Sequence, residues 1–127
     1  MPNKDAKRKQ AVNKAFSSYD VDYDYVMDVL NRNKKKNVAQ RILEPDKYPV
    51  IQNEDGSVSS LLMSTATADG KAYAYPLIYQ DDNGQLIDMR DDWKGAFEKA
   101  RKRGDAIEFQ DEKEAEWFTK NYKKAWR

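Results

Sequence analysis

Asn53-Glu54-Asp55-Gly56-Ser57-Val58-Ser59-Ser60 marks the place where this chain changes from helical to β-rich sequence. Asp55-Gly56 is a turn pair, because glycine adopts the positive φ angles of tight turns without a steric cost. The residues from Ser57 to Leu61 then lead into a strand. The stretch therefore predicts a tight turn that is followed by strands.

Three helices are predicted before the turn, and the first, over residues 4–16, has only a thin apolar stripe and would be marginal alone. The helix over residues 20–31 has apolar side chains at i, i+3, i+4 and i+7, the spacing of one helix face: Tyr23, Val26, Met27 and Leu30. A short helix follows from about Asn37 to Leu43, and Pro45 ends it because the residue before a proline is disfavoured in the α region. Residues 45–49 are expected to be extended, and Val50-Ile51 to be packing residues.

The sequence after the turn predicts a hairpin and two capped helices. Asp69-Gly70 is a two-residue hairpin signal between two β-rich arms. Asp91 or Asp92 is expected to cap the next helix, and Gly104 to end it in the left-handed conformation. Asp111 with Glu114 resembles a capping box at the start of the last helix.

These elements predict an α+β fold. A small antiparallel sheet from residues 57–89, with an added strand at 107–109, is expected to pack against helices at 92–103 and 111–124. We divide the chain into a helical N-terminal extension, residues 1–44, and a compact α+β domain, residues 45–127. Four aromatic residues from three of these elements are predicted to form the core: Trp93, Phe97, Phe109 and Phe118.

Charge is segregated along the first part of the chain, although the net charge is only +1. Residues 4–14 and 32–41 are basic, and the segment between them carries only acidic charges. Such blocks are typical of solvated helix faces. The alternative is a basic surface that binds nucleic acid or an acidic protein. The candidate binding residues are Lys7, Arg8, Lys9, Arg32, Lys34, Lys35, Lys36 and Arg41.

The composition excludes most catalytic arrangements. The chain has no cysteine and no histidine, which removes thiol chemistry, disulfides and the commonest general base. Asp81-Asp82, Asp88 and Asp91-Asp92 form the strongest acidic cluster, but their spacing fits no EF-hand loop, and a turn with a helix cap is the favoured interpretation. Only carboxylates, lysines, tyrosines and hydroxyls remain for chemistry, and we predict no metal and no cofactor. A carboxylate-based enzyme or an inhibitor of a host enzyme stays a third alternative function. No apolar run is long enough to predict a membrane span.

Aromatic residues alternate with basic ones in two places. Tyr73, Tyr75 and Tyr79 lie in the predicted strands, and the segment 120–127 carries both lysines and aromatics. Single-stranded nucleic acid can stack on such rings. However, tyrosines at alternate positions are also what a half-buried strand shows, and packing is the favoured interpretation.

The order of motifs in residues 37–124 resembles a module found in many tailed bacteriophages, both as short proteins and as segments of long internal-virion polypeptides. The resemblance depends on the following residues: Asn37–Leu43, Pro45–Ile51, Asn53–Ser60, Ser64–Thr67, Asp69-Gly70, Tyr73–Ile78, Asn83-Gly84, Trp93–Ala100, Ile107–Phe109 and Glu112–Tyr122 with Glu114-Ala115.

The resemblance implies a non-enzymatic virion-associated structural or assembly protein that docks onto other virion proteins. Its expected location is the virion, and the host cytoplasm during assembly. Ejection with the genome, contact with DNA and oligomerisation through the virion assembly are compatible with this role. The alternative function is a nucleic-acid-binding module that uses the basic segments 4–14 and 32–41.

Overall fold

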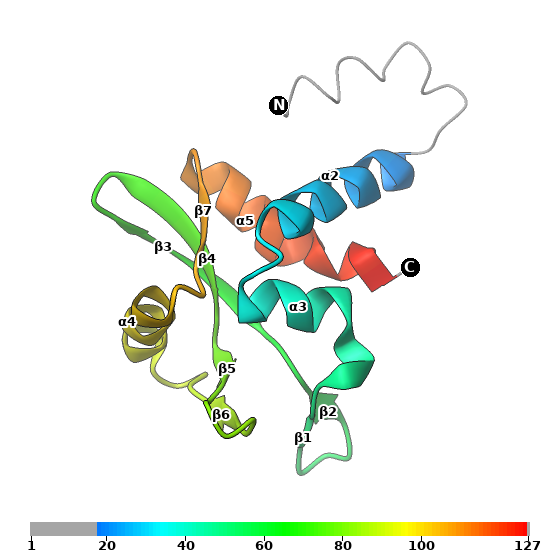
Figure 1. Cartoon of the computed structure of the whole chain (residues 1–127), viewed down its shortest axis with the longest axis vertical. Helices are drawn as coiled ribbons and strands as arrows, with labels where there is room; N and C mark the ends of the chain where they lie inside the picture. Colours follow the sequence, from blue (N-terminus) through cyan, green and yellow to red (C-terminus); the bar gives the residue numbers. More distant parts are fainter. Residues whose placement is uncertain (1–17, 127) are drawn as a thin grey trace.

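The computed structural model describes residues 18–126, with side chains from residue 21 onward. It has the α+β architecture that the sequence predicts (Figure 1). In chain order the elements are α2 (Ser18–Arg32), α3 (Asn37–Leu43), the 3-10 helix η1 (Pro45–Lys47), β1 (Ile51–Gln52), β2 (Val58–Ser59), β3 (Met63–Ala68), β4 (Lys71–Pro76), β5 (Ile78–Gln80), β6 (Leu86–Asp88), α4 (Trp93–Arg103), β7 (Ile107–Phe109), α5 (Glu112–Asn121) and the 3-10 helix η2 (Tyr122–Trp126).

The strands form three separate antiparallel sheets where the sequence predicted one. Strands β3, β4 and β7 make the central sheet in that order, while β1 pairs only with β2 and β5 only with β6. Pro76 has no N–H to donate, and β4 ends there. The chain then enters β5 at Ile78 and pairs with β6 instead of continuing the central sheet. The hairpin at Asp69-Gly70 is confirmed, with positive φ angles at both residues.

Strand β4 separates two hydrophobic clusters because its side chains alternate between the faces of the sheet. Ala72 and Ala74 belong to the main core on one face, and Tyr75 to a smaller cluster on the other. Figure 1 shows α4 on one side of the β3–β4 hairpin and α2, α3 and α5 on the other. The central sheet is thus covered by helices on both faces.

Helices α2 and α3 contribute much of the main core. Their buried residues pack together with residues of α5, η2 and the central sheet: Val26, Val29, Leu30, Val38, Ala39 and Ile42 with Ala115, Phe118, Tyr122, Ala72, Ala74, Ile107 and Phe109. Two further contacts join the ends of the chain: Tyr25 packs edge-on against Trp117 at 5.1 Å, and Trp126 Nε1 donates to the Ile42 carbonyl at 2.6 Å. The division predicted at residue 44 therefore does not coincide with a gap in the packing.

Both C-terminal helices begin where the capping signals predict, and α4 also ends at its predicted glycine, whereas α5 ends at Asn121 and the 3-10 helix η2 follows it. Asp92 accepts a hydrogen bond from the Gly95 N–H at 3.0 Å, and Gly104 ends α4 with φ +69°. Asp111 caps α5 by accepting from the Glu114 N–H at 2.9 Å. Gly95 suits this cap, because a Cβ at that position would collide with the Asp92 carboxylate. Local hydrogen bonding thus fixes the helix boundaries.

Three sequence-based expectations are corrected. Trp93 is 53% exposed because Ala96 and Ala100, and not Trp93, form the buried stripe of α4. Residues 45–47 form a turn of 3-10 helix instead of an extended connector, since proline is favourable in the first turn of a helix. Val50, expected to pack, is 47% exposed. Of the other predicted core aromatics, Phe109 and Phe118 are buried, as predicted, and Phe97 is half-buried.

Candidate interaction site

The hairpin β1–β2 is closed by hydrogen bonds that depend on its turn residues. The Asn53 and Ser57 backbones bond at 2.8 Å, and Gly56, with φ +89°, allows the chain to reverse between them. Asp55 accepts from the Ser57 N–H at 2.9 Å and from the Ser57 hydroxyl at 2.6 Å. These hydrogen bonds lower the pKa of the Asp55 carboxyl, because they favour its ionised form. The turn is therefore organised by its own side chains.

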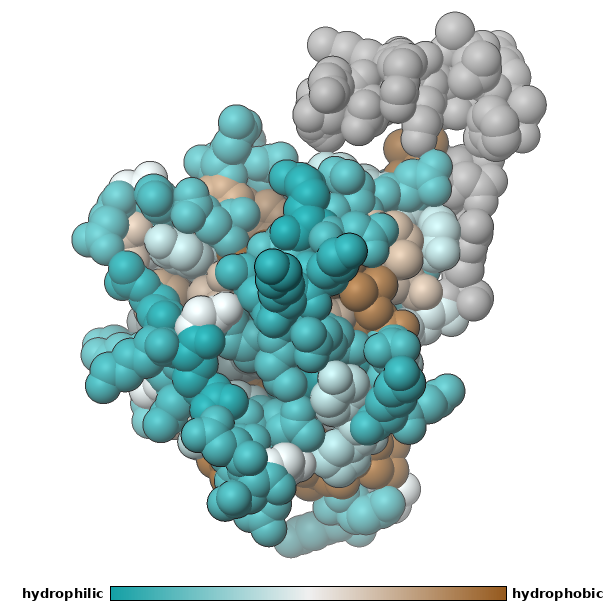
Figure 2. All heavy atoms as spheres, viewed as in Figure 1, coloured by the Kyte–Doolittle hydropathy of each residue, from teal (hydrophilic) through white to brown (hydrophobic). Residues whose placement is uncertain are grey.

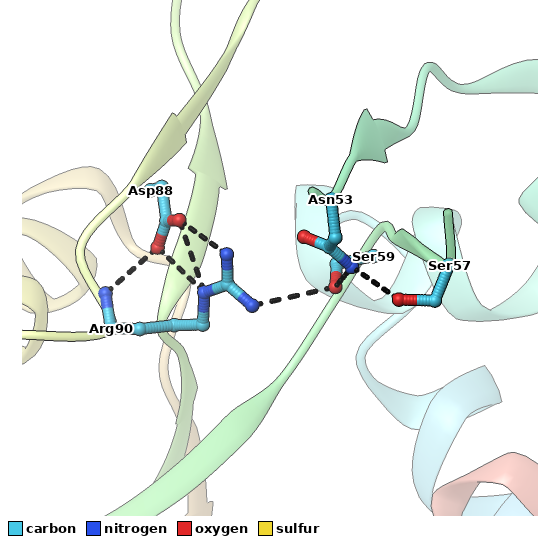
Figure 3. Close-up of polar contacts among 5 residues, drawn as sticks. All are labelled: Asn53, Ser57, Ser59, Asp88 and Arg90. Atoms are coloured by element: carbon cyan, nitrogen blue, oxygen red, sulfur yellow. Dashed lines mark hydrogen bonds and ion pairs between the residues drawn. The ribbon is translucent and has the colours of Figure 1, made fainter. Parts of the chain in front are cut away.

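A line of polar contacts holds this hairpin against β6 (Figure 3). The Asn53 amide donates to the hydroxyls of Ser57 and Ser59, each at 3.0 Å. The Arg90 guanidinium donates to Ser59 at 3.4 Å and makes a two-pronged ion pair with Asp88 at 2.9 and 2.6 Å. Hydrogen bonding by Arg90 lowers the pKa of Asp88. The hairpin is thus linked through its side chains to a distant part of the chain.

The hairpin also presents an exposed apolar face. Gln52 lies opposite Val58 in the ladder, and Ile51 opposite Ser59, so Val58 points away from the polar contacts. Val58 is 55% exposed, and Val50 lies on the same side by alternation. In the described part of the chain the outer edges of β1 and β2 pair with no other strand. Figure 2 shows this side of the molecule as mainly hydrophilic, with hydrophobic residues visible in several separate places, one of them at the lower end, where Figure 1 places the hairpin.

Some of the basic residues predicted to bind a partner are at the surface. Lys34 and Lys35 are exposed in the turn between α2 and α3, and Lys36 is half-buried as the residue before α3. Arg32 is exposed but pairs with Asp28 at 3.1 Å, one helical turn away. Lys7, Arg8 and Lys9 lie outside the described residues. The three lysines therefore form the accessible part of the second basic segment.

Arg41 is a correction, because it is buried, with only 3% of its surface exposed. Its Nη2 donates to the Ser60 carbonyl at 2.5 Å, and burial lowers the pKa of the guanidinium. Nearby Asp105, also 3% exposed, accepts from the Val38 N–H at 2.7 Å, and burial raises the pKa of its carboxyl. Arg41 thus holds segments of the fold together and is inaccessible to a phosphate.

Three of the acidic residues singled out in the sequence, Asp81, Asp88 and Asp92, act as turn or helix caps. Asp81 accepts from the backbone N–H groups of Asn83 and Gln85, both at 2.9 Å. Asp82 pairs with Arg103 at 3.2 Å, and Asp88 and Asp92 have the partners described above. Within residues 18–126, no three carboxylates are grouped closely enough to hold a metal ion.

Helix α4 brings cations over tyrosine rings, a feature that the sequence interpretation did not assign. Arg101 lies over Tyr73 at 5.5 Å, and both Lys99 and Arg103 lie over Tyr79 at 5.4 Å. In the sequence, only the basic run Arg101-Lys102-Arg103 indicated these contacts. The run was interpreted as a helix C-terminus, where cations interact favourably with the helix dipole. Only the packing of α4 on the strands shows the rings beneath these side chains.

Comparison with protein families, with curated proteins and with solved structures found no match to this chain. None of the helices in the described residues is both long and apolar enough to span a membrane.

Proposed function

We propose that this protein is a non-enzymatic structural or assembly component of a tailed phage particle, which acts by docking onto other virion proteins. The observation that carries the proposal is the β1–β2 hairpin with the preceding Val50: Val50 and Val58 are exposed, and the outer edges of the two strands pair with no other strand within residues 18–126. The resemblance of residues 37–124 to the phage module supports the viral setting.

The hairpin has the features of a docking element. An unpaired strand edge offers backbone N–H and C=O groups to a partner strand, and each of these two edges is two residues long. Val50 and Val58 would add apolar burial to these main-chain bonds, since each is about half exposed in the free chain.

The polar contacts behind the hairpin favour binding in a second way. Arg90 links Ser59 to Asp88, which restrains the hairpin relative to β6 before a partner arrives. An ordered element loses less conformational entropy on binding than a loose one, and more of the contact energy then contributes to affinity.

The first test is whether the protein is present in purified particles, measured by quantitative mass spectrometry against the major capsid protein. The second is the double variant Val50→Asp/Val58→Asp, in which two carboxylates would be buried without partners on docking. Incorporation is expected to fall about tenfold or more, since an unpaired buried charge costs several kcal/mol.

Thr67→Asp is the matched control, because it introduces the same side chain at an exposed strand position of β3. It is expected to be incorporated like the wild type. Absence of the wild-type protein from particles would refute the proposal, and equal incorporation of the double variant would show that the hairpin is not the docking element.

A further inference from the structure

Two basic segments that are far apart in the sequence lie near each other in the fold. The Asn37 side chain, which follows the Lys34–Lys36 turn, donates to the Gln80 side chain at 2.8 Å. Arg103, at the end of α4, donates to the Gln80 carbonyl at 2.6 Å. Gln80 therefore joins the start of α3 to the end of α4.

Buried Asp105 makes a second connection between the same segments. Its carboxylate accepts from the Val38 N–H at 2.7 Å, and Lys36, Arg41 and Arg103 are all close enough to lower its pKa, against the larger effect of burial. Three cations thus surround one carboxylate that is itself inaccessible. The surroundings of Asp105 carry a surplus of positive charge.

We define the basic face as six residues: Lys34, Lys35, Lys36, Lys99, Lys102 and Arg103. On α4, Lys102 and Arg103 follow Lys99 by three and four residues, so both lie one helical turn from Lys99 on the same flank of the helix. Among the described residues, none of the five lysines has a carboxylate within ion-pair distance, whereas lysines elsewhere, such as Lys47 and Lys71, do.

The negative charges near this face are few and exposed. Asp82, paired with Arg103, has a side chain that is 94% exposed, and Glu98 is exposed on α4. Exposed ion pairs are screened by solvent and contribute little. A ligand with closely spaced negative charges can therefore compete with them for the same cations.

We propose that the basic face binds the phosphate backbone of nucleic acid, without reading its sequence. Lysine is a point donor that suits phosphate contacts, and within residues 18–126 none of the five lysines has to break an ion pair to bind one. Base stacking contributes no affinity, because the half-buried Tyr79 ring already carries Lys99 and Arg103 at 5.4 Å each. The contacts are electrostatic, and duplexes of unrelated sequence bind alike.

This assignment revises the basic surface that the sequence predicted. Arg41 is not part of the basic face because it is buried. Lys99, Lys102 and Arg103 are part of it because α4 packs near the Lys34–Lys36 turn. It is independent of the docking role of the β1–β2 hairpin, which lies on other elements. The two proposals can fail separately, because the test below uses only purified protein and DNA.

The test measures binding of the full chain to two unrelated short DNA duplexes by fluorescence anisotropy, between about 50 and 200 mM salt. The test variant is Lys34→Gln/Lys35→Gln/Lys102→Gln. The control variant is Lys113→Gln/Lys120→Gln/Lys123→Gln, which removes three exposed lysines from α5 and η2 and changes the net charge equally. Circular dichroism checks that both variants are folded, and residues 1–17 are identical in all three proteins.

Each phosphate contact contributes about 0.9 to the slope of log affinity against log salt for duplex DNA. The test variant is expected to lose about 2 to 3 from this slope and about tenfold or more in affinity at low salt, while the control keeps the wild-type slope. Equal losses in both variants would overturn the proposal, since net charge would then explain the binding. Tighter binding to polyglutamate than to DNA would overturn it in favour of an acidic protein partner.

Discussion

Ile42→Ala tests whether helices α2 and α3 belong to the core or form an arm that can detach. Ile42 has no exposed surface, and it lies in the main core together with Phe118 and Tyr122. Replacing a buried isoleucine by alanine lowers the free energy of unfolding by about 2–5 kcal/mol, because apolar burial is lost and a cavity is left behind. A small domain has a net stability of about 5–15 kcal/mol, so this single change is expected to remove a large share of it.

The measurement is urea unfolding, followed by far-ultraviolet circular dichroism and by tryptophan fluorescence. With a urea dependence of about 2 kcal/mol per molar, the expected loss lowers the unfolding midpoint by about 1 to 2.5 M. Both signals should change together, because Trp117 and Trp126 contact α2 and α3. Val58→Ala is the control, and its 55% exposed side chain should cost no more than about 0.5 kcal/mol.

Two outcomes would refute this reasoning. A loss below about 1 kcal/mol would mean that Ile42 is not tightly packed in solution. A helical signal lost at lower urea than the fluorescence signal would mean that α2 and α3 detach before the remainder unfolds. The extension up to residue 44 would then be a separable unit, as the sequence pattern predicts.

Three further predictions concern single sites. Phe118→Ala should lower the free energy of unfolding by about 3–5 kcal/mol, because the ring is fully buried. Trp93→Ala should lower it by less than about 1 kcal/mol, because the Trp93 side chain is 53% exposed. Equal losses of stability in urea unfolding would contradict the assigned packing. Gly95→Ala should stabilise the chain by about 1 kcal/mol when Asp92 is also replaced by alanine, but not when the Asp92 cap is present. A double-mutant cycle measures this coupling between positions 92 and 95, and additive effects of the two substitutions would contradict the predicted collision. Burial raises the pKa of Asp105, so the folded state binds its proton more tightly than the unfolded state does. The contribution of Asp105 to stability is greatest below its unfolded pKa of about 4 and is lost as the pH rises through the folded pKa. The free energy of unfolding of the wild type relative to Asp105→Asn should therefore fall as the pH rises. A difference that stays constant across a pH series would contradict this prediction.

The sequence predicted those features that depend on neighbouring residues. Asp69-Gly70 forms its hairpin, and Asp92 and Asp111 cap their helices, because the groups involved lie within a few positions of each other. The turn at Gly56 was predicted for the same reason. Local chemistry is sufficient at these positions.

The sequence did not predict features that depend on distant packing. Arg41 was expected at the surface because arginine is rarely buried, but the Ser60 carbonyl and nearby Asp105 accommodate its charge inside the fold. Trp93 was expected inside because it is large and apolar, but Ala96 and Ala100 take the buried positions of α4. The proximity of α4 to the Lys34–Lys36 turn likewise depends on Gln80, which belongs to neither segment.

The contacts between the first helices and the last residues have a consequence for how the chain folds during synthesis. Lys124 pairs with Asp22 at 2.6 Å, and Trp126 bonds to Ile42, so these partners are separated by 102 and 84 residues. At ribosomal rates of about 5–20 residues per second, α2 and α3 emerge seconds before α5 and η2 are available. During that interval their apolar faces, with Leu30 and Ile42, have no native surface to cover them, and a chaperone or a second nascent chain can bind there first.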